Sequence, residues 1–505
     1  MKIFTNDEIR EIDRYTIETE GVPSLELIER VAAGIASDII ENWIPEKPVV
    51  VFAGPGNNGA DALSVARILT EHGFKPAVYL FNIGGDRLSE DCRKCRDRLL
   101  EIPDVDLTEI VSNFSLPDLQ KHHLVIDGLF GSGLRDPLSG GFVTLVRYIN
   151  ESRATVLSID VPSGLFGDWN GTNISRNVIH ADVTYAIQFP RISFFLSDNQ
   201  KLIGRWKLID IGLSRKAIAS TMPSFYLVED EDVRRKLKPR SQFCSKADLG
   251  SVAIVAGSYG MMGAAVLAAR SALRAGAGKV TVISPRCGFS VLQAAVPEAM
   301  MQFDKNDQVT TRISLNHDYT AVALGPGLGT HELTVTAIDD FLVSAKKPVI
   351  IDADALNCIA GNPAMLNNLP VLSIITPHAG EFDRLFGVQP SAEARLRKAI
   401  EMAHLYNIFI ILKGHYTAIV RPDGRVYFNS SGTPAMATAG AGDCLTGIIA
   451  SFLAQGYLPE IASLMGVFVH GRAGELAEEE QGLYGVTAGD IAANVGKAIK
   501  SIMNS

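Results

Sequence analysis

The amino-acid sequence predicts an α/β protein with two domains, each built on a parallel sheet that is covered by helices on both faces. Short apolar runs bounded by glycine or polar residues alternate with helical patterns, and this alternation occurs twice along the chain. The length of 505 residues also exceeds what one hydrophobic core normally holds. Two separate α/β domains are therefore expected.

The first alternating series occupies about residues 1–212. Two helices are expected within residues 6–44, because Thr5 and Ser24 offer capping oxygens and apolar residues follow Ser24 at helical spacing. The strands predicted beyond them are 48–53, 76–81, 123–127, 155–160 and 181–187. Helices are predicted near 60–72, 89–101 and 139–151.

Residues 213–245 are more polar and interrupt the alternation, so we interpret them as the connection between the domains. The second series begins at Ser251. Its predicted strands are 251–256, 279–283, 320–324, 348–352, 371–375 and 408–412, followed by a hairpin at 417–428. Helices are predicted at 443–454, 460–479 and 487–503.

Composition limits the classes of partner. The net charge of −9 provides no broad basic surface, which argues against nucleic-acid binding. The N-terminus lacks the apolar core of a signal peptide and no apolar run is long enough to span a bilayer, so no membrane association is expected. Six cysteines do not form a disulfide framework, and a reducing cytoplasm is therefore expected.

Polar clusters end three strands of the first series. They are the loop 54–61, Asp127 and Asp160, with a further glycine-rich loop at 131–135. Ligands bind outside the carboxyl ends of the strands in open parallel sheets. No Walker A motif is present, which excludes a standard P-loop site. Carboxylates, an asparagine and a serine indicate a hard cation beside an acid/base residue, whereas the alternative is that both aspartates only cap helices.

Three motifs of the first series together resemble the NAD(P)H-hydrate epimerase family. They are Gly-Pro-Gly-Asn-Asn-Gly-x-Asp at 54–61, Asp-Gly-Leu-Phe-Gly-Ser-Gly-Leu at 127–134 and Ser-Ile-Asp-Val-Pro-Ser-Gly at 158–164. The resemblance covers residues 1–212 and implies a Rossmann-like three-layer sandwich that interconverts the R and S epimers of hydrated NADH and NADPH.

The same resemblance implies roles for individual residues. Asp160 would be the acid/base at the hydrated ring, and K⁺ would be held by Asn58, Asp127 and Ser163. The residues that would line the dinucleotide site are Asn57, Asn58, Gly59, Ala60, Asp61, Gly131, Ser132, Gly133, Leu134, Arg135, Asp136, Pro137 and Asp160. Ala60 replaces a usual glycine, which would weaken substrate approach if that backbone needs a positive φ.

Polar or glycine-rich segments also end the strands of the second series. They lie at 257–263, 325–329, 352–356, 376–381 and 413–417, and a glycine-rich loop at 440–443 opens a helix. Amides at Ala441, Gly442 and Asp443 can form an anion hole at the start of a helix, and Asp443 can take a proton from an attacking hydroxyl. This pattern predicts phosphoryl transfer. The alternatives are that Asp443 only complements the helix dipole and that His378 is an ordinary polar residue.

The second half, from about residue 225, resembles the ribokinase-like NAD(P)H-hydrate dehydratase family. The resemblance implies that ADP phosphorylates the S epimer and that phosphate then leaves, restoring NADH or NADPH, with Mg²⁺ in this domain. Asp443 would be catalytic and would contact the hydrate together with Ala264, Gly327 and His378. The nucleotide would be held by Lys413, Gly414, His415, Tyr416, Thr417 and Gly442. Ala441 replaces a usual serine or threonine, which removes a hydroxyl but keeps the amide.

The order of the two halves resembles bifunctional NAD(P)H-hydrate repair enzymes. The predicted division is an epimerase domain at 1–212, a connection at 213–245 and a dehydratase domain at 225–505, in a homo-oligomer that acts on NADHX, NADPHX and ADP. One alternative is a ribokinase-like kinase for a small molecule fused to a non-catalytic Rossmann-like domain. Another is a binding module like that of mRNA-decapping scaffolds, against which the acidic balance argues.

Overall fold

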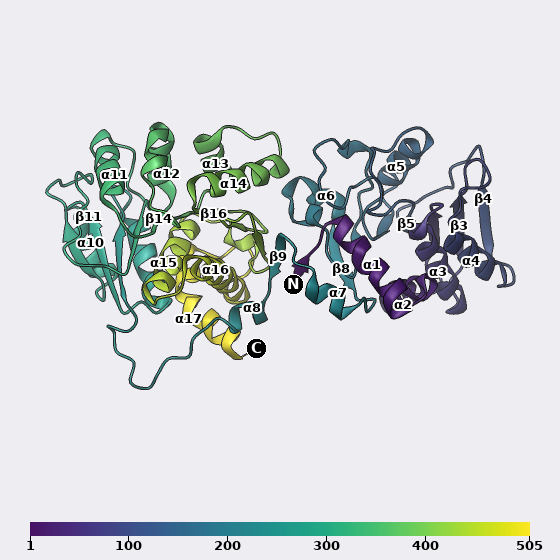
Figure 1. The fold of residues 1–505 in the computed structure, drawn as a ribbon, viewed down its shortest axis with the longest axis horizontal. Coiled ribbons are helices and arrows are strands. Elements are labelled where there is room, and N and C mark those ends of the chain that lie inside the picture. The colour runs from purple at the N-terminus through teal and green to yellow at the C-terminus, as the bar shows by residue number, and fades with distance from the viewer. Residues whose placement is uncertain (505) are drawn as a thin grey trace. The chain divides into compact units, whose positions relative to one another are not determined.

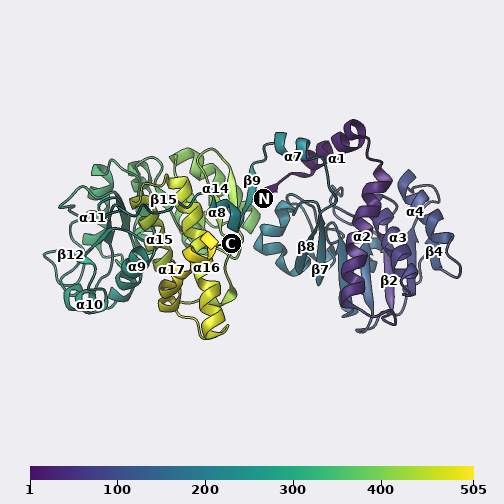
Figure 2. The same ribbon diagram turned by 90° about the horizontal axis from the view of Figure 1, so that it is seen from below.

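The computed structural model describes residues 1–504 and contains two compact units (Figures 1 and 2). The N-terminal unit comprises Lys2–Ser224, and the C-terminal unit comprises Met1 together with the chain from Phe225 onward. Both units are α/β, which confirms the predicted fold class.

The N-terminal unit contains a seven-stranded parallel sheet with the order β4-β3-β2-β5-β6-β7-β8. The strands are β2 (Val49–Ala53), β3 (Pro76–Phe81), β4 (Asp106–Ile110), β5 (Leu124–Gly128), β6 (Thr155–Ile159), β7 (Val183–Ile187) and β8 (Arg205–Ile209), and a short β1 covers Lys2–Ile3. The strand order reverses between β2 and β5. That reversal is the place where open α/β sheets bind ligands.

Helices cover both faces of this sheet. They are α1 (Asn6–Glu20), α2 (Ser24–Asn42), α3 (Asn57–Glu71), α4 (Glu90–Leu100), α5 (Gly141–Glu151), α6 (Gln200–Ile203) and α7 (Arg215–Ser220), with short 3₁₀ turns at Ser175–Asn177, Ile192–Phe195 and Ser197–Asn199. Because side chains alternate along a strand, Val51 packs in the core under α1 to α4, whereas Val50 packs in the core under α5. The unit is therefore the predicted three-layer sandwich.

The C-terminal unit is built on a larger sheet, in which the strand order is β9-β18-β17-β16-β15-β14-β13-β10-β11-β12. β17 runs antiparallel to both of its neighbours, and the other neighbouring pairs are parallel. The strands are β9 (Phe225–Val228), β10 (Ser251–Val255), β11 (Lys279–Ser284), β12 (Met300–Phe303), β13 (Ala321–Leu324), β14 (Val349–Ile351), β15 (Ile374–Ile375), β16 (Phe409–Leu412), β17 (Ala418–Val420) and β18 (Val426–Asn429). The order reverses between β10 and β13.

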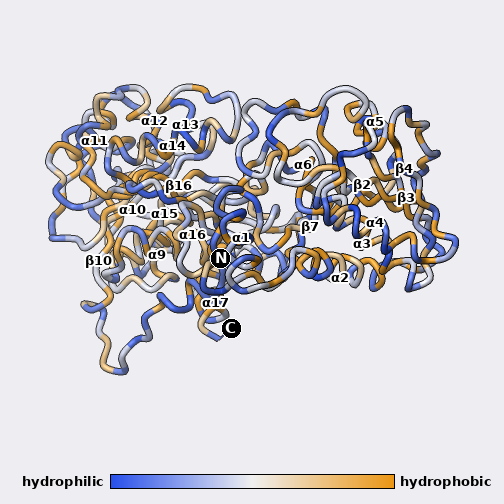
Figure 3. The backbone as a smooth tube through the Cα atoms, turned by 45° about the vertical axis from the view of Figure 1, so that its right-hand side comes forward, coloured by the Kyte–Doolittle hydropathy of each residue, from blue (hydrophilic) through white to orange (hydrophobic). Residues whose placement is uncertain are grey.

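Two helical layers enclose the C-terminal sheet. Figure 1 shows α11 to α14 on one side and α15 to α17 on the other. The helices are α8 (Asp230–Arg234), α9 (Met262–Arg274), α10 (Gly288–Ala295), α11 (Glu332–Ser344), α12 (Ala353–Gly361), α13 (Ala379–Phe386), α14 (Ala392–Tyr406), α15 (Ala441–Ala454), α16 (Pro459–Gln481) and α17 (Ala488–Asn504), with 3₁₀ turns at Pro363–Asn368 and Pro434–Met436. Hydrophobic residues make up most of the central strands, and β10 in Figure 3 is an example.

Five strands were not predicted from the sequence: β1, β4, β8, β9 and β12. β4, β8 and β12 lie at sheet edges, where partly exposed positions replace the continuous apolar run of a central strand. Residues 213–245, interpreted as a connection, contain α7, β9 and α8. β9 is short and pairs in parallel with β18, about two hundred residues later in the chain, so no local pattern marks it.

Candidate active sites

A cavity of about 600 Å³ lies at the switch point of the N-terminal sheet. Its walls come from one face of α1 and α2 and from the segments that follow β2, β5, β6 and β7. Of the residues that the sequence predicted for the dinucleotide site, those lining the cavity are Asn57, Asn58, Asp61, Gly131, Ser132, Gly133, Leu134 and Asp160. Gly59, Ala60, Arg135, Asp136 and Pro137 do not line it, and Arg135 and Asp136 are exposed.

Asp160 follows β6 directly and is held in a strained conformation, with φ of 67°. Its Oδ1 accepts hydrogen bonds from Nε and Nη2 of Arg191 at 3.1 and 2.5 Å, and its Oδ2 accepts from the Ser132 amide at 2.7 Å. These charge-assisted bonds fix the orientation of the carboxyl group. Asp160 is therefore held in one orientation at the cavity wall.

Several buried polar atoms of the cavity residues have no hydrogen-bond partner in residues 1–504. They are Oδ1 of Asn6, both side-chain amide atoms of Asn58 and Nη1 of Arg191. A buried polar group without a partner costs roughly 1–3 kcal/mol, and most such groups in folded proteins are satisfied. Their gathering around one cavity indicates a site for a polar ligand.

Asp127 and Ser163 form a second layer behind this cavity, where both side chains are fully buried. The Asp127 carboxylate accepts hydrogen bonds from both Oγ and N of Ser163, at 2.5 and 2.8 Å, from Oγ of Ser158 at 2.8 Å and from the Leu129 amide at 3.3 Å. Burial raises the pKa of Asp127, and these neutral donors lower it again in part. The pair is therefore ordered, but none of the residues that the structure describes is a basic partner of it.

Close packing explains three residues of the glycine-rich loops. A Cβ on Gly131 would lie 2.8 Å from Oδ2 of Asp160 and 3.3 Å from Oδ1 of Asn58. A Cβ on Gly59 would lie 1.8 Å from the Gly54 carbonyl oxygen, so neither position has room for a side chain. Ala60, in contrast, is a buried residue of α3 without a positive φ, so the condition under which its methyl group would weaken the site does not arise.

Asn6, Asp13 and Arg191 are among the residues lining the cavity that the sequence analysis missed. Asn6 and Asp13 come from α1, and Arg191 comes from the segment after β7. None belongs to a glycine-rich or strand-end motif. The structure brings them to the site by tertiary packing alone.

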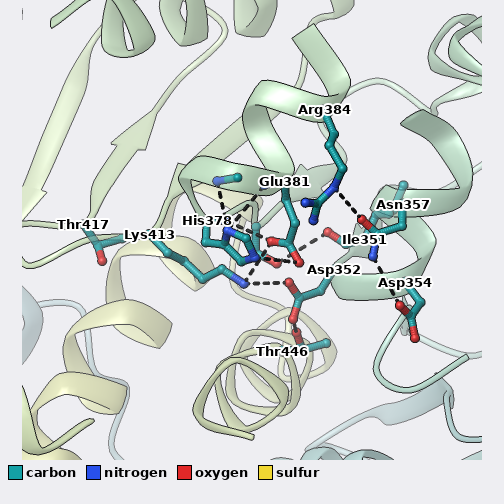
Figure 4. A network of polar contacts seen from close by, with 12 residues as sticks. Ile351, Asp352, Asp354, Asn357, His378, Glu381, Arg384, Lys413, Thr417 and Thr446 are labelled. Carbon is teal, nitrogen blue, oxygen red and sulfur yellow. Dashed lines mark hydrogen bonds and ion pairs between the residues drawn. The ribbon is translucent and has the colours of Figure 1, made fainter. Parts of the chain in front are cut away.

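The C-terminal unit assembles a charged cluster at the carboxyl ends of β14, β15 and β16 (Figure 4). Nζ of Lys413 donates to Oδ1 of Asp352 at 2.9 Å and lies 3.6 Å from Oε2 of Glu381. Thr446 Oγ1 donates to the other oxygen of Asp352 at 2.7 Å. Burial lowers the pKa of Lys413, but Asp352 and Glu381 outweigh it, so its pKa is raised and the ammonium is retained.

Asp443 lies in the first turn of α15, beside this cluster. Its carboxyl group has no hydrogen-bond partner within residues 1–504, in contrast to Asp352. Burial, followed by the charge of Asp352, raises the pKa of Asp443 to about 7. A carboxyl group with this pKa can exchange a proton near neutral pH.

The glycine-rich loop before α15 leaves space beside Lys413. Gly440 has φ of 90°, and a Cβ on Gly442 would lie 3.4 Å from Nζ of Lys413. The first amides of a helix lack intrahelical partners, so those of Gly442 and Asp443 are available to an anion. His470 of α16 contacts the backbone of Ala441 at this loop. Burial lowers the pKa of His470 to about 4, so its ring is neutral at pH 7.

Gly327 and His378 are two further residues that the sequence predicts to contact the hydrate. Gly327 has φ of 62° and packs against the 257–264 loop, where its added Cβ would lie 3.0 Å from the Cβ of Ala264. His378 is exposed and caps α13, since its Nδ1 accepts from the amides of Gly380 and Glu381 at 3.0 and 3.3 Å. Its backbone also bridges Lys413, which begins the 413–417 segment. Ligand contacts by these residues and by His415, Tyr416 and Thr417 stay predictions.

Comparison with known proteins follows the same division. The family described as YjeF-related protein N-terminus matches residues 24–193, and the NAD(P)H-hydrate dehydratase family matches residues 252–497. The bifunctional NAD(P)H-hydrate repair enzyme Nnr of Thermofilum pendens is 33% identical, over 99% of this chain and 97% of its own length. The chain belongs to the bifunctional NAD(P)H-hydrate repair enzyme family.

A second relative agrees with this assignment to the repair-enzyme family. The enzyme of the same name from Moorella thermoacetica is 32% identical over 97% of this chain and 95% of its own length. The crystal structure of the ADP/ATP-dependent NAD(P)H-hydrate dehydratase of Bacillus subtilis, co-crystallised with ATP and Mg²⁺, has a TM-score of 0.49 and 31% identity and covers 55% of this chain and 98% of its own.

Within residues 1–504, no helix is long and apolar enough to cross a membrane.

Proposed function

We propose that the protein repairs hydrated NADH and NADPH in two steps. The N-terminal unit interconverts the R and S epimers of the hydrate. The C-terminal unit uses ADP to dehydrate the S epimer, giving NADH or NADPH, AMP and phosphate. The full-length similarity to named bifunctional repair enzymes is the observation that carries this proposal.

In the epimerase site, Asp160 is the residue that moves a proton at the hydrated ring. Arg191 and the Ser132 amide hold its carboxylate at the cavity wall. The unpartnered amide of Asn58 and the loop 131–134 bind the polar parts of the dinucleotide. This arrangement supplies position and acid–base help, which is typically worth ~10²–10⁴-fold in rate.

Asn58 in the cavity wall and the two residues behind it fit a potassium ion. Asn58, Asp127 and Ser163 offer oxygen ligands, as a hard cation prefers, and Oδ1 of Asn58 is buried without a partner among residues 1–504. In the same described part of the chain, the fully buried Asp127 carboxylate has no basic partner. K⁺ bound there would supply the missing positive charge and order the 131–134 loop.

In the dehydratase site, Asp443 removes the proton of the ring hydroxyl while the hydroxyl oxygen receives a phosphoryl group from ADP. The amides of Gly442 and Asp443 stabilise the transferring group. Lys413, which Asp352 and Glu381 hold in its charged form, lies beside Gly442 and binds the phosphates there. Ala264, Gly327 and His378 then contact the hydrate, and residues 413–417 contact the nucleotide.

Magnesium would reach this site together with the nucleotide. Within residues 1–504, no group of three or more His, Cys, Asp or Glu side chains could hold a metal ion. Asp352 and Glu381 are the nearby carboxylates that would attract the nucleotide-bound Mg²⁺, and the metal would supply the positive charge that neutralises the phosphates. A cytoplasmic location and homo-oligomerisation stay predictions from the sequence.

Incubation of the purified protein with a mixture of R and S hydrates, ADP, Mg²⁺ and K⁺ tests the proposal. The absorbance of the reduced nicotinamide should rise until both epimers are consumed, with one AMP formed for each NADH. A plateau at the amount of S epimer would contradict the epimerase assignment. No AMP would contradict the dehydratase assignment.

A further inference from the structure

Helix α1 places a second carboxyl group in the N-terminal cavity. Ile9, Asp13 and Ile17 recur every four residues and line the cavity, so one face of α1 forms part of its wall. The helix is anchored by a capping box between Thr5 and Glu8 and by the Asn6 amide, which donates to Asp168. Asp13 is therefore held on a rigid element that faces the ligand site.

Asp13 is the only polar residue of that trio, and its carboxyl group has no hydrogen-bond partner within residues 1–504. The charged groups around it come from four elements: Arg10 on α1, Asp61 on α3, Asp160 after β6 and Arg191 after β7. Arg191 is already committed to Asp160. A carboxyl group in this position is free to meet a ligand rather than to stabilise the fold.

The surroundings raise the pKa of two carboxyl groups of the cavity. Burial raises the pKa of Asp13 to about 6, with Arg191 opposing and Asp160 adding to the effect. Burial, followed by the charges of Asp160 and Asp13, raises the pKa of Asp61 well above its ordinary value. Asp13 is thus a group that can both give and take a proton near neutral pH, in the same cavity as Asp160 with its ion pair to Arg191.

Epimerisation of the hydrate needs proton transfer at both faces of one carbon. The ring nitrogen expels the hydroxyl group as water when an acid supplies a proton, and the C–O bond breaks to leave an iminium ion. Water then adds to the other face and gives a proton to a base, so the C–O bond is restored and no oxidant or reductant is used. Asp160, whose carboxyl group is fixed by Arg191, serves one face of the ring, and the other face needs a second group.

We propose that Asp13 is the second proton-transfer residue of the epimerase site, working with Asp160 from a different wall of the cavity. The inference rests on the proposed epimerase function. The pair holds one proton in the active state, and Asp13 and Asp160 exchange the roles of acid and base between the two directions. Loss of that proton stops the reaction in both directions.

The test uses the full-length protein and measures interconversion of the R and S hydrates by chiral separation, without ADP. In the wild type, kcat/KM should fall about tenfold per pH unit above pH 6. Asp13→Asn should lower kcat by ~10²-fold or more, with KM changed less than about threefold, and should abolish that pH-dependent fall. Asp7→Asn, an exposed position on the same helix, should leave the rate and the pH profile unchanged.

Two results would overturn the inference. One is an Asp13→Asn variant with the wild-type rate, and the other is a variant with raised KM that keeps the fall above pH 6, which would indicate binding alone. If Asp13→Asn melts below the wild type, the Asp13→Glu variant distinguishes a role in proton transfer from a structural role. For proton transfer, Asp13→Glu should restore the fall of kcat/KM above pH 6, whereas for a merely structural role it would not. A wild type that does not interconvert the epimers refutes the epimerase proposal itself rather than the role of Asp13.

Discussion

The two active sites occupy the same kind of place in their sheets but treat their key aspartates differently. Asp160 is ion-paired to Arg191 and fixed by the Ser132 amide. Asp443 has no hydrogen-bond partner within residues 1–504, and burial raises its pKa to about 7, while the nearby lysine is bound by Asp352 and Glu381. The partners of an aspartate, rather than its position at a strand end, therefore decide whether it is an anchored anion or an exchangeable base.

The largest effect that would sharpen this comparison is expected from Asp443→Ala. Dehydration of the S epimer should fall by ~10³-fold or more, because the proton acceptor acts in the transition state. ADP affinity, measured by calorimetry, should change little, since Lys413 and the loop amides remain. Near-normal turnover would reduce Asp443 to a first-turn residue of α15.

The pH dependence of the wild-type dehydratase tests the same residue. Asp443 must be ionised to accept a proton, and its pKa is raised to about 7. The rate should therefore fall about tenfold per pH unit below pH 7 and level off above it. A flat profile between pH 5.5 and 8 would contradict the assignment of Asp443 as the base.

Asp160→Asn examines the anchored member of the pair. Epimerisation should fall by ~10²–10⁴-fold, while dehydration of the pure S epimer continues at the wild-type rate. The substitution leaves Arg191 buried without its counter-charge, so the melting temperature should be recorded as well. Wild-type epimerisation by this variant would show that the ion pair is structural.

A smaller effect is expected when the anchored carboxylate is displaced rather than removed. In Gly131→Ala the new methyl group would lie 2.8 Å from Oδ2 of Asp160, so epimerisation should slow by ~10-fold. Gly141→Ala is the matched control, since no atom lies within 4 Å of its added Cβ and the residue begins α5. Equal rates for both variants would mean that the position of Asp160 is not critical.

The smallest effect is expected from exchange of K⁺ for tetramethylammonium. Epimerisation should slow a few-fold and the melting temperature of the N-terminal unit should fall, because an ion that binds only the native state stabilises it by mass action. Dehydration of the S epimer should change less. An unchanged epimerisation rate and melting temperature would count against the site at Asn58, Asp127 and Ser163.

The site residues predicted from the sequence belong to local motifs. Asn58, Asp127 and Asp160 belong to motifs at strand ends, and parallel strands bring their carboxyl ends to one edge, whereas Asp443 belongs to the glycine-rich start of α15. Asp13 and Arg191 could not be found in this way. They belong to no local pattern, and only the packing of α1 and of the segment after β7 brings them to the cavity.

Secondary structure shows the same limit. Central strands such as β2 and β10 are continuous apolar runs and were predicted. The edge strand β4 alternates exposed and partly buried residues, and β9 depends on a partner two hundred residues away. Pairing over such distances leaves no trace in the local sequence.

Complementation between two single-site variants tests the central claim, that one chain carries two separate reactions, most directly. Asp160→Asn and Asp443→Ala, each supplied with pure R hydrate, ADP, Mg²⁺ and K⁺, should form little NADH alone. Mixed in equal amounts, they should convert all of the R hydrate, because the S epimer released by one protein is the substrate of the other. A mixture no more active than the separate variants would contradict the account.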